Sequence, residues 1–413
     1  MDVAIWSGWT SQQKHAVVAS YLGWTLDAFD FFLLVFVMKD VAAEFGTTVP
    51  VVSWAILLTL ACRPIGAFIF GRAADRWGRR PTLMVDIVLF SILELASGFA
   101  PNLTIFLILR ALFGVAMGGE WGVGASLAME TIPVNARGFV SGLLQSGYPT
   151  GYLLASVVYG LLFPTIGWRG MFFIGVLPAL LVLYIRRNVP ESAHWDATRG
   201  RPSHSLLQVI RSNWRVALYA VVLMTAFNFF SHGTQDLYPT FLQIQHHLKP
   251  HAVGAIAVFY NIGAILGGIS CGILSERFGR RRIMVGTALL SLLALPLWAF
   301  SESAALLAIG AFMMQVMVQG AWGVIPAHLN ELSPEGVRAT FPGFVYQLGN
   351  FFASTNSVIQ SRLVEHFDKN YGLALALVVA IAAVTIAVLA ACGFEAKGVV
   401  FGQAQPAAKP PPG

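Results

Sequence analysis

Long apolar stretches, separated by short polar loops, follow one another along almost the whole chain. A helix that crosses the hydrocarbon core of a bilayer needs about 20 mainly apolar residues. Twelve stretches meet this requirement, and the longest polar interruption, 186–215, follows the sixth. The pattern therefore predicts transmembrane helices at approximately 17–38, 50–70, 82–100, 104–129, 139–163, 169–186, 216–242, 253–272, 283–300, 304–329, 340–361 and 371–393.

The composition also indicates a membrane protein. Apolar residues make up 56% of the chain and charged residues only 11%, whereas a soluble domain carries roughly 25% charged residues. A water-soluble chain of this size could not hide so much apolar surface, so lipid must be its solvent. The first stretch carries two aspartates and lacks a small-residue cleavage site, which favours a transmembrane helix over a removable signal peptide.

Two motifs occur twice at one spacing. GRAADRWGR at 71–79 recurs as GILSERFGR at 272–280, and ETIPVNAR at 130–137 recurs as ELSPEGVR at 331–338. Both offsets are 201 residues (272 − 71 and 331 − 130). Two independent motifs at one offset indicate duplication of a six-helix unit, which is one known transporter design.

The duplication and the polar interruption together predict the domain organisation of an all-α membrane protein. We expect an N-terminal six-helix bundle at 1–186, a cytoplasmic linker at 187–215 and a C-terminal six-helix bundle at 216–393. Residues 394–413 are expected to form a disordered cytoplasmic tail, because they have little apolar surface to bury.

The distribution of basic residues predicts the orientation in the membrane. With both termini inside, 19 of the 26 Lys and Arg lie in inside loops and tails, five lie outside, and two lie within helices. The positive-inside rule therefore places both termini in the cytoplasm. The net charge of +6 follows from this topology, and we expect no nucleic-acid partner.

These motifs resemble those of the major facilitator superfamily along essentially the whole chain. The pattern GxxxDRxGRR starts at Gly71, a degenerate copy starts at Gly272, and both ExxPxxxR loops are present. The resemblance implies two six-helix bundles that rock about a site near the middle of the membrane.

The repeated loops are predicted to act in gating rather than in substrate binding. An acidic residue stands at the same place in both copies, Asp75 and Glu276, where topology alone requires only basic residues. Asp75 is suited to accept hydrogen bonds from helix N-terminal amides or a nearby arginine. A basic cluster that serves topology alone is the alternative. The gating candidates are Asp75, Arg76, Arg79, Glu130, Arg137, Glu276, Arg280, Glu331 and Arg338.

Charged groups within the membrane that the repeat does not duplicate are candidates for chemistry. Each costs at least about 2.5–3.5 kcal/mol on insertion scales, and structural duties should recur in both halves. The 201-residue offset pairs Arg110 with Ala311 and Glu120 with Ala321. The ionisable residues of the first bundle are Asp27, Asp30, Arg63, Asp86, Glu94, Arg110 and Glu120.

Asp27 and Asp30 are three residues apart on the first helix. Two nearby carboxylates in a low dielectric cannot both ionise freely, so this pair is suited to carry a proton. Glu120 is a further proton-coupling candidate, although its depth matches that of Arg63 and also favours a structural ion pair.

Three other charged residues of this bundle have less definite expectations. We expect Asp86 to lie near the membrane surface, and the sequence offers no partner for Glu94. Arg110 keeps its charge at any working pH, and its planar fork fits a carboxylate. That carboxylate is either Asp27 or Asp30 in a static salt bridge, or the substrate.

The seventh helix carries a polar stripe. Asn228, His232, Asp236 and Thr240 follow one another at i, i+4, i+8 and i+12 and so share one helix face. The i, i+4 spacing favours pairing of His232 with Asp236, and Pro239 favours a kink. Hydrogen bonding between helices is the alternative role for the stripe.

The same residues match a more specific pattern. NFFSHGTQDLYPT at 228–240 fits the motif Nxx(S/T)Hx(S/T)QDxxxT of the fungal lactate/pyruvate:proton symporters and their bacterial relatives. LDAFDFF at 26–32 and GGEWGVG at 118–124 resemble the wider sialate:proton symporter family. The resemblance implies substrate handling by Arg110, Asn228, His232, Gln235, Gln347 and Asn350, with Asp236 in the same group.

We therefore expect a proton-coupled symporter of short monocarboxylates, with lactate or pyruvate as the first choice. The alternatives are a larger acid, such as sialate or an aromatic carboxylate, and a proton-independent facilitator of a neutral solute. The membrane acids, with Asp236 among them, disfavour the facilitator.

No Walker loop, HExxH, CxxC or GxGxxG motif is present, so we expect no enzyme activity, cofactor or metal. The expected partners are a small organic anion, a proton and the lipid bilayer, and we expect a monomer. The long tails of the fungal proteins are absent, which favours a bacterial inner membrane.

Overall fold

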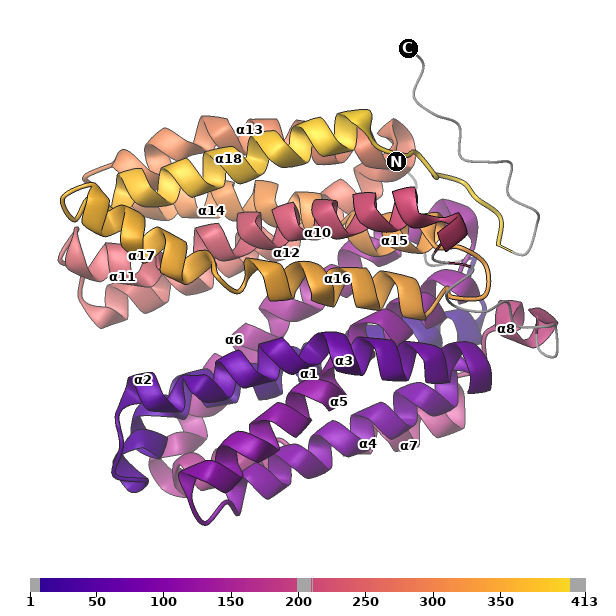
Figure 1. Cartoon of the computed structure of the whole chain (residues 1–413), viewed down its shortest axis with the longest axis horizontal. Helices are drawn as coiled ribbons and strands as arrows, with labels where there is room; N and C mark the ends of the chain where they lie inside the picture. Colours follow the sequence, from indigo (N-terminus) through magenta and orange to yellow (C-terminus); the bar gives the residue numbers. More distant parts are fainter. Residues whose placement is uncertain (1–7, 199–208, 210, 402–413) are drawn as a thin grey trace.

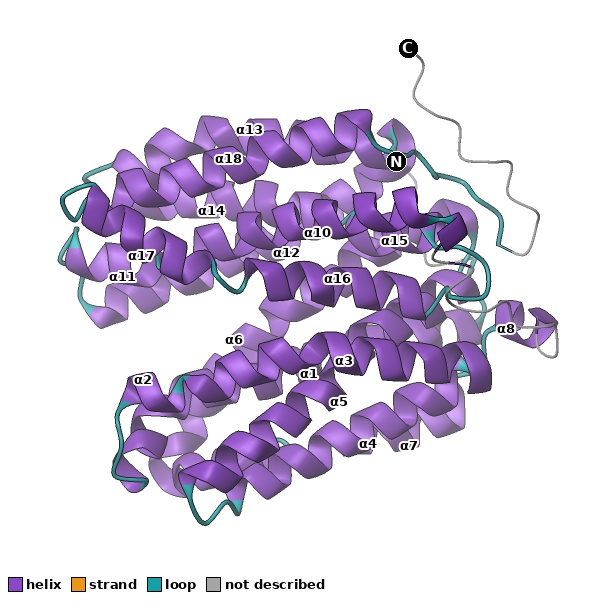
Figure 2. Ribbon diagram, viewed as in Figure 1, coloured by secondary structure: helices purple, strands orange, loops and turns teal. Residues whose placement is uncertain are grey.

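The computed structural model describes residues 8–198, 209 and 211–401, and this part of the chain contains helices and loops but no β-strand (Figure 2). The first half comprises α1 (Ser11–Glu44), α2 (Val49–Val52), α3 (Trp54–Trp77), α4 (Arg79–Gly98), α5 (Leu103–Thr131), α6 (Arg137–Ile174), α7 (Ala179–Asn188) and the short α8 (Ala193–Thr198). The second half comprises α10 (Trp214–Gln235), α11 (Tyr238–Ile244), α12 (Pro250–Phe278), α13 (Arg280–Phe300), α14 (Ala304–Trp322), α15 (Ile325–Leu332), α16 (Thr340–Ala353), α17 (Asn356–His366) and α18 (Tyr371–Cys392).

The twelve predicted spans are present, and several of them are interrupted. Ten helical stretches of the described chain are long and apolar enough to cross a bilayer. Gly167, with φ of 64°, separates the fifth predicted span from the sixth within α6. The predicted span 169–186 is itself divided at 175–178, between the end of α6 and α7. The predicted span 340–361 is divided between α16 and α17. Both breaks shorten the continuous helix without removing the span.

The two halves repeat the same helix packing. In the first half α3 packs on α5, α1 on α6, and α4 on α5. In the second half the corresponding pairs are α12 on α14, α10 on α16, and α13 on α14. The halves form two bundles, one coloured indigo to magenta and the other coral to yellow in Figure 1. The duplication predicted from the sequence is therefore visible in the fold.

The bundles meet through α6 with α12 and α3 with α16. Glycines let these backbones approach closely. A Cβ atom on Gly142 would lie 2.3 Å from the carbonyl oxygen of Gly268, and one on Gly71 would lie 2.6 Å from Cα of Thr340. Close packing of small residues is a common way for membrane helices to associate.

The loops 71–80 and 272–282 lie at one end of the molecule, which we call the basic end. Asp75 accepts hydrogen bonds there from the backbone N–H groups of Ala339 at 3.0 Å and Thr340 at 3.1 Å, at the start of α16. Glu276 accepts one from the N–H of Gly138, at the start of α6. Gly138 and Ala339 are 201 residues apart, so each bundle caps the repeat-related helix of the other.

Repeat-related ion pairs support these caps. Arg79 donates two hydrogen bonds to Glu130, at 3.1 and 3.0 Å, and Arg280 donates two to Glu331, at 3.0 and 2.9 Å. Among the described residues, all hydrogen bonds between the two bundles lie toward this end. The bundles are farther apart at the end that carries α2, α11 and α17 (Figure 1). The basic end is therefore the closed one.

The first eight residues of the tail expected at 394–413 contact the rest of the protein. The Phe394 ring packs on Tyr219, with centroids 5.4 Å apart. Phe401 lies under the guanidinium groups of Arg137, at 3.5 Å, and Arg338, at 4.0 Å. These residues bury aromatic surface against the basic end, which the polar composition of the tail did not indicate. Residues 402–413 lie outside the described part.

The predicted linker at 187–215 also contacts the closed end. The Trp195 indole N–H donates to the backbone carbonyl of Asp75 at 3.0 Å, and the Ser192 hydroxyl donates to Glu130. The linker therefore adds to the contacts around the repeated loops. Residues 199–208 and 210 of the predicted linker lie outside the described part.

Candidate functional site

His232 stands at the centre of the polar groups in the C-terminal bundle. Its Nδ1 lies 3.0 Å from Asp236 Oδ1, and its Nε2 lies 3.0 Å from Asn350 Oδ1. The side chains of His232 and Asp236 are 27% and 26% exposed, which is unusual among the buried polar groups nearby. The predicted pairing of His232 with Asp236 is confirmed, and Asn350 joins them from α16.

Two helix breaks bring the partners of Asp236 together. α10 ends at Gln235 and α11 begins at Tyr238, one residue before Pro239, so the predicted kink is present. The break between α16 and α17 places the Asn356 amide 3.2 Å and the Ser357 hydroxyl 2.9 Å from Asp236 Oδ2. With His232, these donors satisfy a carboxylate at a helix C-terminus, where the helix dipole disfavours negative charge.

The other predicted substrate residues of this bundle have different surroundings. The Asn228 amide donates to the carbonyl of Met224 at 2.8 Å, and the Gln235 amide donates to Gln315 Oε1 at 3.1 Å. Gln347 is fully buried, and neither its amide nitrogen nor its oxygen has a hydrogen-bond partner. Gln347 is therefore the amide whose hydrogen-bonding capacity is available for a ligand.

The N-terminal bundle contains an unusual set of buried charges. In its membrane-spanning part, five carboxyl side chains are 0% exposed, and they share this part with two nearly or fully buried guanidinium groups, those of Arg63 and Arg110. If all five ionised, three would have no countercharge, which a low-dielectric interior does not allow. These five are Asp27, Asp30, Asp86, Glu94 and Glu120. The bundle must therefore hold protons on some of these acids.

Arg110 differs from its expected arrangement, because it bonds neither aspartate of α1. Its Nη1 donates to Glu94 Oε2 at 2.5 Å, and its guanidinium lies 3.9 Å from the ring centroid of Phe113 and 5.6 Å from that of Phe172. The side chain is fully buried. Arg110 is thus enclosed within the N-terminal bundle, and it is the partner that the sequence did not offer for Glu94.

Asp30 lies beside this ion pair. A Cβ atom on Gly175 would lie 2.4 Å from Cγ of Glu94 and 3.1 Å from Oδ1 of Asp30. Neither oxygen of Asp30 has a hydrogen-bond partner. The glycine between α6 and α7 therefore leaves room for two acids beside one arginine, a convergence that hydropathy does not reveal.

The expected ion pair between Arg63 and Glu120 is absent from the described structure. Arg63 donates to the sulfur of Met117 at 2.7 Å. The Glu120 carboxylate has no hydrogen-bond partner and lies against α1, 2.2 Å from where Gly23 would carry a Cβ atom. Matching depth did not ensure contact, because the two side chains leave their helices in different directions. The Asp86 side chain is fully buried in the protein.

Aromatic side chains from both bundles meet in the middle of the molecule. Tyr346 of α16 lies 4.6 Å from Trp121 and 5.5 Å from Trp322, measured between ring centroids. Trp24 stacks on Tyr148 at 5.7 Å. These rings lie between the polar centre and the closed contacts of the basic end.

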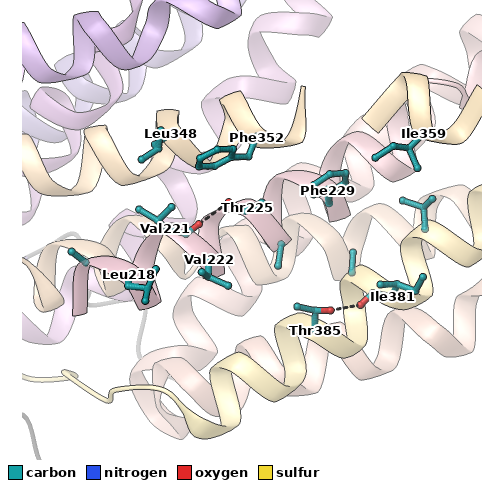
Figure 3. Close-up of a pocket in the computed structure, with 14 residues that line it drawn as sticks. Leu218, Val221, Val222, Thr225, Phe229, Leu348, Phe352, Ile359, Ile381 and Thr385 are labelled. Atoms are coloured by element: carbon teal, nitrogen blue, oxygen red, sulfur yellow. Dashed lines mark hydrogen bonds between the residues drawn. The ribbon is translucent and has the colours of Figure 1, made fainter. Parts of the chain in front are cut away.

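A large groove lies away from this centre. It has a volume of about 740 Å³ and is formed by α10, α16, α17 and α18. Its walls are almost entirely apolar, and the hydroxyls of Thr225 and Thr385 donate within their own helices, to the carbonyls of Val221 and Ile381 (Figure 3). Such a surface suits lipid chains and offers no partner for an anion, so we do not place the polar site there.

The fold and the buried charges are those of a membrane transporter, and the sequence comparisons agree. The chain matches the model of the Major Facilitator Superfamily over residues 21–249 and 228–406. It belongs to this superfamily and is a transporter rather than an enzyme.

Similar proteins include transporters of organic acids. The chain is 31% identical to the carboxylic acid transporter protein homolog of Saccharomyces cerevisiae over 87% of its length, and it spans 62% of that protein. It is 27% identical to the sialic acid transporter NanX of Escherichia coli, covering 94% of this chain and 96% of that one. Among solved structures, the proton:xylose symporter XylE has the same fold, with a TM-score of 0.77 at 18% identity, over 95% of this chain and 98% of that chain.

Proposed function

We propose that the protein couples the symport of a proton and an organic monocarboxylate, with lactate or pyruvate as the first choice. The observation that carries the proposal is the placement of five buried carboxyls, with only two guanidiniums, in the membrane-spanning part of the bundle that faces the partly exposed His232–Asp236 pair. Buried acids without full countercharge bind protons, and a histidine held by an aspartate provides a polar contact for an anion.

The roles of the site residues follow their surroundings. We assign substrate contact to His232, Asn350 and Gln347. His232 is partly exposed at the centre and bonds to Asn350, and the side-chain amide of Gln347 has no hydrogen-bond partner. Asn228 and Gln235, which bond within the C-terminal bundle, shape the wall of the site.

Proton transfer is assigned to Asp27, Asp30 and Glu120, whose carboxylates have no hydrogen-bond partners. Asp236 orients His232. Proton binding on the N-terminal bundle and substrate contacts from the C-terminal bundle then favour the same closed, charge-neutral centre.

The basic end serves as the cytoplasmic gate in this proposal. By the positive-inside rule, that end and both termini lie on the cytoplasmic side of a bacterial inner membrane. The conformation is then closed to the cytoplasm. The hydrogen bonds that Asp75 and Glu276 accept at the starts of α16 and α6 keep it closed. Opening breaks both caps, and Arg79 and Arg280 hold the acids of their own loops in place. We propose that one chain forms the transport unit.

A larger organic acid is the second candidate. Four tyrosines stand around the centre and would contact a ring or a conjugated chain: Tyr148, Tyr152, Tyr260 and Tyr346. The similarity to a sialic acid transporter favours the same reading. Substrate size therefore has to be measured directly.

Uptake into proteoliposomes tests both candidates. Accumulation of labelled L-lactate should rise as external pH falls from about 7.5 to about 5.5, because the proton is a co-substrate, and a protonophore should abolish it. Empty liposomes provide the control for diffusion of the neutral acid.

Competition by unlabelled pyruvate, sialate and benzoate then ranks the substrates. Stronger competition by sialate or benzoate than by pyruvate would select the larger acid. Accumulation that survives without a proton gradient would exclude proton symport.

A further inference from the structure

The two arginines buried in the membrane-spanning part of the N-terminal bundle, Arg63 and Arg110, have different partners. Arg110 is held by Glu94 at 2.5 Å. Arg63 forms no ion pair within 4.0 Å with any described residue, and its only hydrogen bond goes to the weakly accepting sulfur of Met117. Its Nε atom has no partner. A guanidinium inside a membrane protein without a carboxylate is costly unless a ligand provides one.

Arg63 also lies between the bundles, whereas Arg110 does not. The groups that interact electrostatically with Arg63 come from α1, α5 and α6 and, across the interface, from α10 and α16. They are Asp27, Glu120, Tyr148, His232 and Tyr346. The contacts of Arg110 come from its own bundle, from α1, α4, α5 and α6. Two Arg110 nitrogens are also unpaired, but its side chain is fully enclosed.

Two tyrosine hydroxyl groups, one from each bundle, lie within electrostatic range of Arg63. The hydroxyls of Tyr148 and Tyr346 have no hydrogen-bond partner in the described part of the chain. Tyr148 belongs to the N-terminal bundle and Tyr346 to the C-terminal bundle. A ligand that bonds to both, and to Arg63, would link the bundles at the centre.

We propose that Arg63 binds the carboxylate of the transported anion, assisted by the hydroxyls of Tyr148 and Tyr346. This inference rests on the proposed transport of an organic anion and assigns its principal contact. A planar guanidinium donates two parallel hydrogen bonds to a carboxylate, which are stronger than bonds between neutral groups. His232, already bonded to Asp236 and Asn350, then faces the rest of the substrate.

The neighbouring Asp27 links this contact to the proton. An ionised Asp27 offsets the charge of Arg63 and opposes a second anion, whereas a protonated Asp27 leaves Arg63 free to attract one. By linkage, a bound carboxylate favours the protonated form of Asp27 to the same degree. The other charged or titratable groups near Asp27 are Asp30, Asp86, Glu94, Glu120, Tyr148 and Tyr346.

Matched arginine variants test the assignment. The measurement is inhibition of labelled-lactate counterflow by unlabelled lactate and by lactamide, its neutral amide. Arg63→Lys keeps the charge and loses the fork, so the affinity for lactate should fall by roughly 10- to 150-fold, since bonds to charged groups contribute about 1.5–3 kcal/mol. The preference for lactate over lactamide should fall by a similar factor.

Arg110→Lys should keep the lactate-to-lactamide preference, because Arg110 bonds Glu94. Arg169→Lys is the control, since Arg169 forms a partly exposed bridge with Glu44 at the protein surface. An Arg63→Lys variant with the wild-type preference would overturn the assignment, and so would loss of that preference in Arg110→Lys instead.

Two further variants keep the test decisive if Arg63→Lys fails to reach the membrane. Tyr346→Phe removes one hydroxyl. It should lower the affinity for lactate by up to about tenfold without changing the affinity for lactamide. Asp27→Asn should abolish the pH dependence of lactate affinity. The proposal is refuted if Tyr346→Phe keeps the wild-type affinity for lactate and Asp27→Asn keeps the wild-type pH dependence of that affinity.

The proposed function itself fails in a different way. If wild-type counterflow is inhibited by no carboxylate among lactate, pyruvate, sialate and benzoate, the transport proposal is wrong. If lactate is inactive but benzoate competes, benzoate and benzamide replace lactate and lactamide in the same comparison of Arg63 variants.

Discussion

At the scale of single residues, the site contrasts groups that are fully bonded with groups that are not. His232 has a partner on each ring nitrogen, whereas Gln347 is buried and has no partner for its side-chain amide. Unsatisfied polar groups in a dry interior cost about 1–3 kcal/mol each. Such a cost is tolerated where a ligand removes it, so the unpaired groups mark the site better than the paired ones.

Replacement of Asp236 tests the histidine arrangement. Asp236→Ala removes the acceptor for His232, Asn356 and Ser357, and the charged bond to His232 alone contributes about 1.5–3 kcal/mol. The apparent affinity for the transported acid should fall by roughly 10- to 150-fold, with the protein still present in the membrane. Counterflow normalised to the amount of membrane protein provides the measurement.

Ser357→Ala is the matched control for that variant. It deletes only one of the hydrogen bonds that Asp236 accepts, at 2.9 Å, and a neutral donor contributes about 0.5–1.5 kcal/mol. Its affinity should therefore fall by no more than about tenfold. Equal effects of the two changes would show that the charge of Asp236 has no part in binding.

Residue identities were easier to predict than residue partners. The 201-residue repeat shows that Arg110 has no charged counterpart in the second half. The same comparison sets Arg63 opposite Ala264, so it marks both arginines equally. Neither Glu94 nor Met117 could be foreseen as a partner, because hydropathy does not fix how a membrane helix is rotated about its axis. The i, i+4 pair His232–Asp236 could be foreseen, because both residues lie on one helix.

At the scale of elements, helix breaks concentrate in the C-terminal bundle. The spans α10–α11, α14–α15 and α16–α17 are each interrupted. Asp236 lies at the first of these breaks, and the α16–α17 break supplies its hydrogen-bond donors Asn356 and Ser357. The spans formed by α1, α4 and α5 are continuous. Helix number, length and order followed from apolar length alone. The break in α16–α17 did not, because no proline lies between Ala353 and Asn356.

Close helix approach at the basic end gives a second prediction. In Gly142→Val the new Cβ would lie 2.3 Å from a backbone oxygen of Gly268, and backbone on both helices cannot yield. The basic end should open, uptake should fall by at least about tenfold, and a cysteine at position 339 should become reactive. Labelling of Ala339→Cys by a water-soluble maleimide, in a background without native cysteines, measures the opening.

Gly286→Val is the control, because a Cβ atom there meets no atom within 4 Å. It should keep normal uptake and leave the cysteine at 339 protected. Protection that persists in Gly142→Val would mean that the packing of α6 on α12 does not set the closed state.

At the scale of the whole molecule, the closed end is nearly symmetric and the charged centre is not. Asp75 and Glu276 make equivalent caps across the interface, while all five fully buried carboxyls within the membrane-spanning part of the N-terminal bundle lack acidic counterparts 201 residues later. Symmetric contacts suit two bundles that rock as units. Because the buried acids lie in the N-terminal bundle and His232 lies in the C-terminal bundle, both bundles contribute to the coupling of proton and substrate.

The segment 394–401 adds a contact to which both bundles contribute. Phe401 follows the last helix of the C-terminal bundle and lies between Arg137 and Arg338, which are 201 residues apart. Each cation–π contact contributes about 0.5–2 kcal/mol, so Phe401→Ala should raise maleimide labelling at position 339 by roughly 2- to 30-fold. Val400→Ala, at an exposed neighbour, should leave labelling unchanged. If Phe401→Ala labels no faster than Val400→Ala, the segment rests on the closed end without stabilising it.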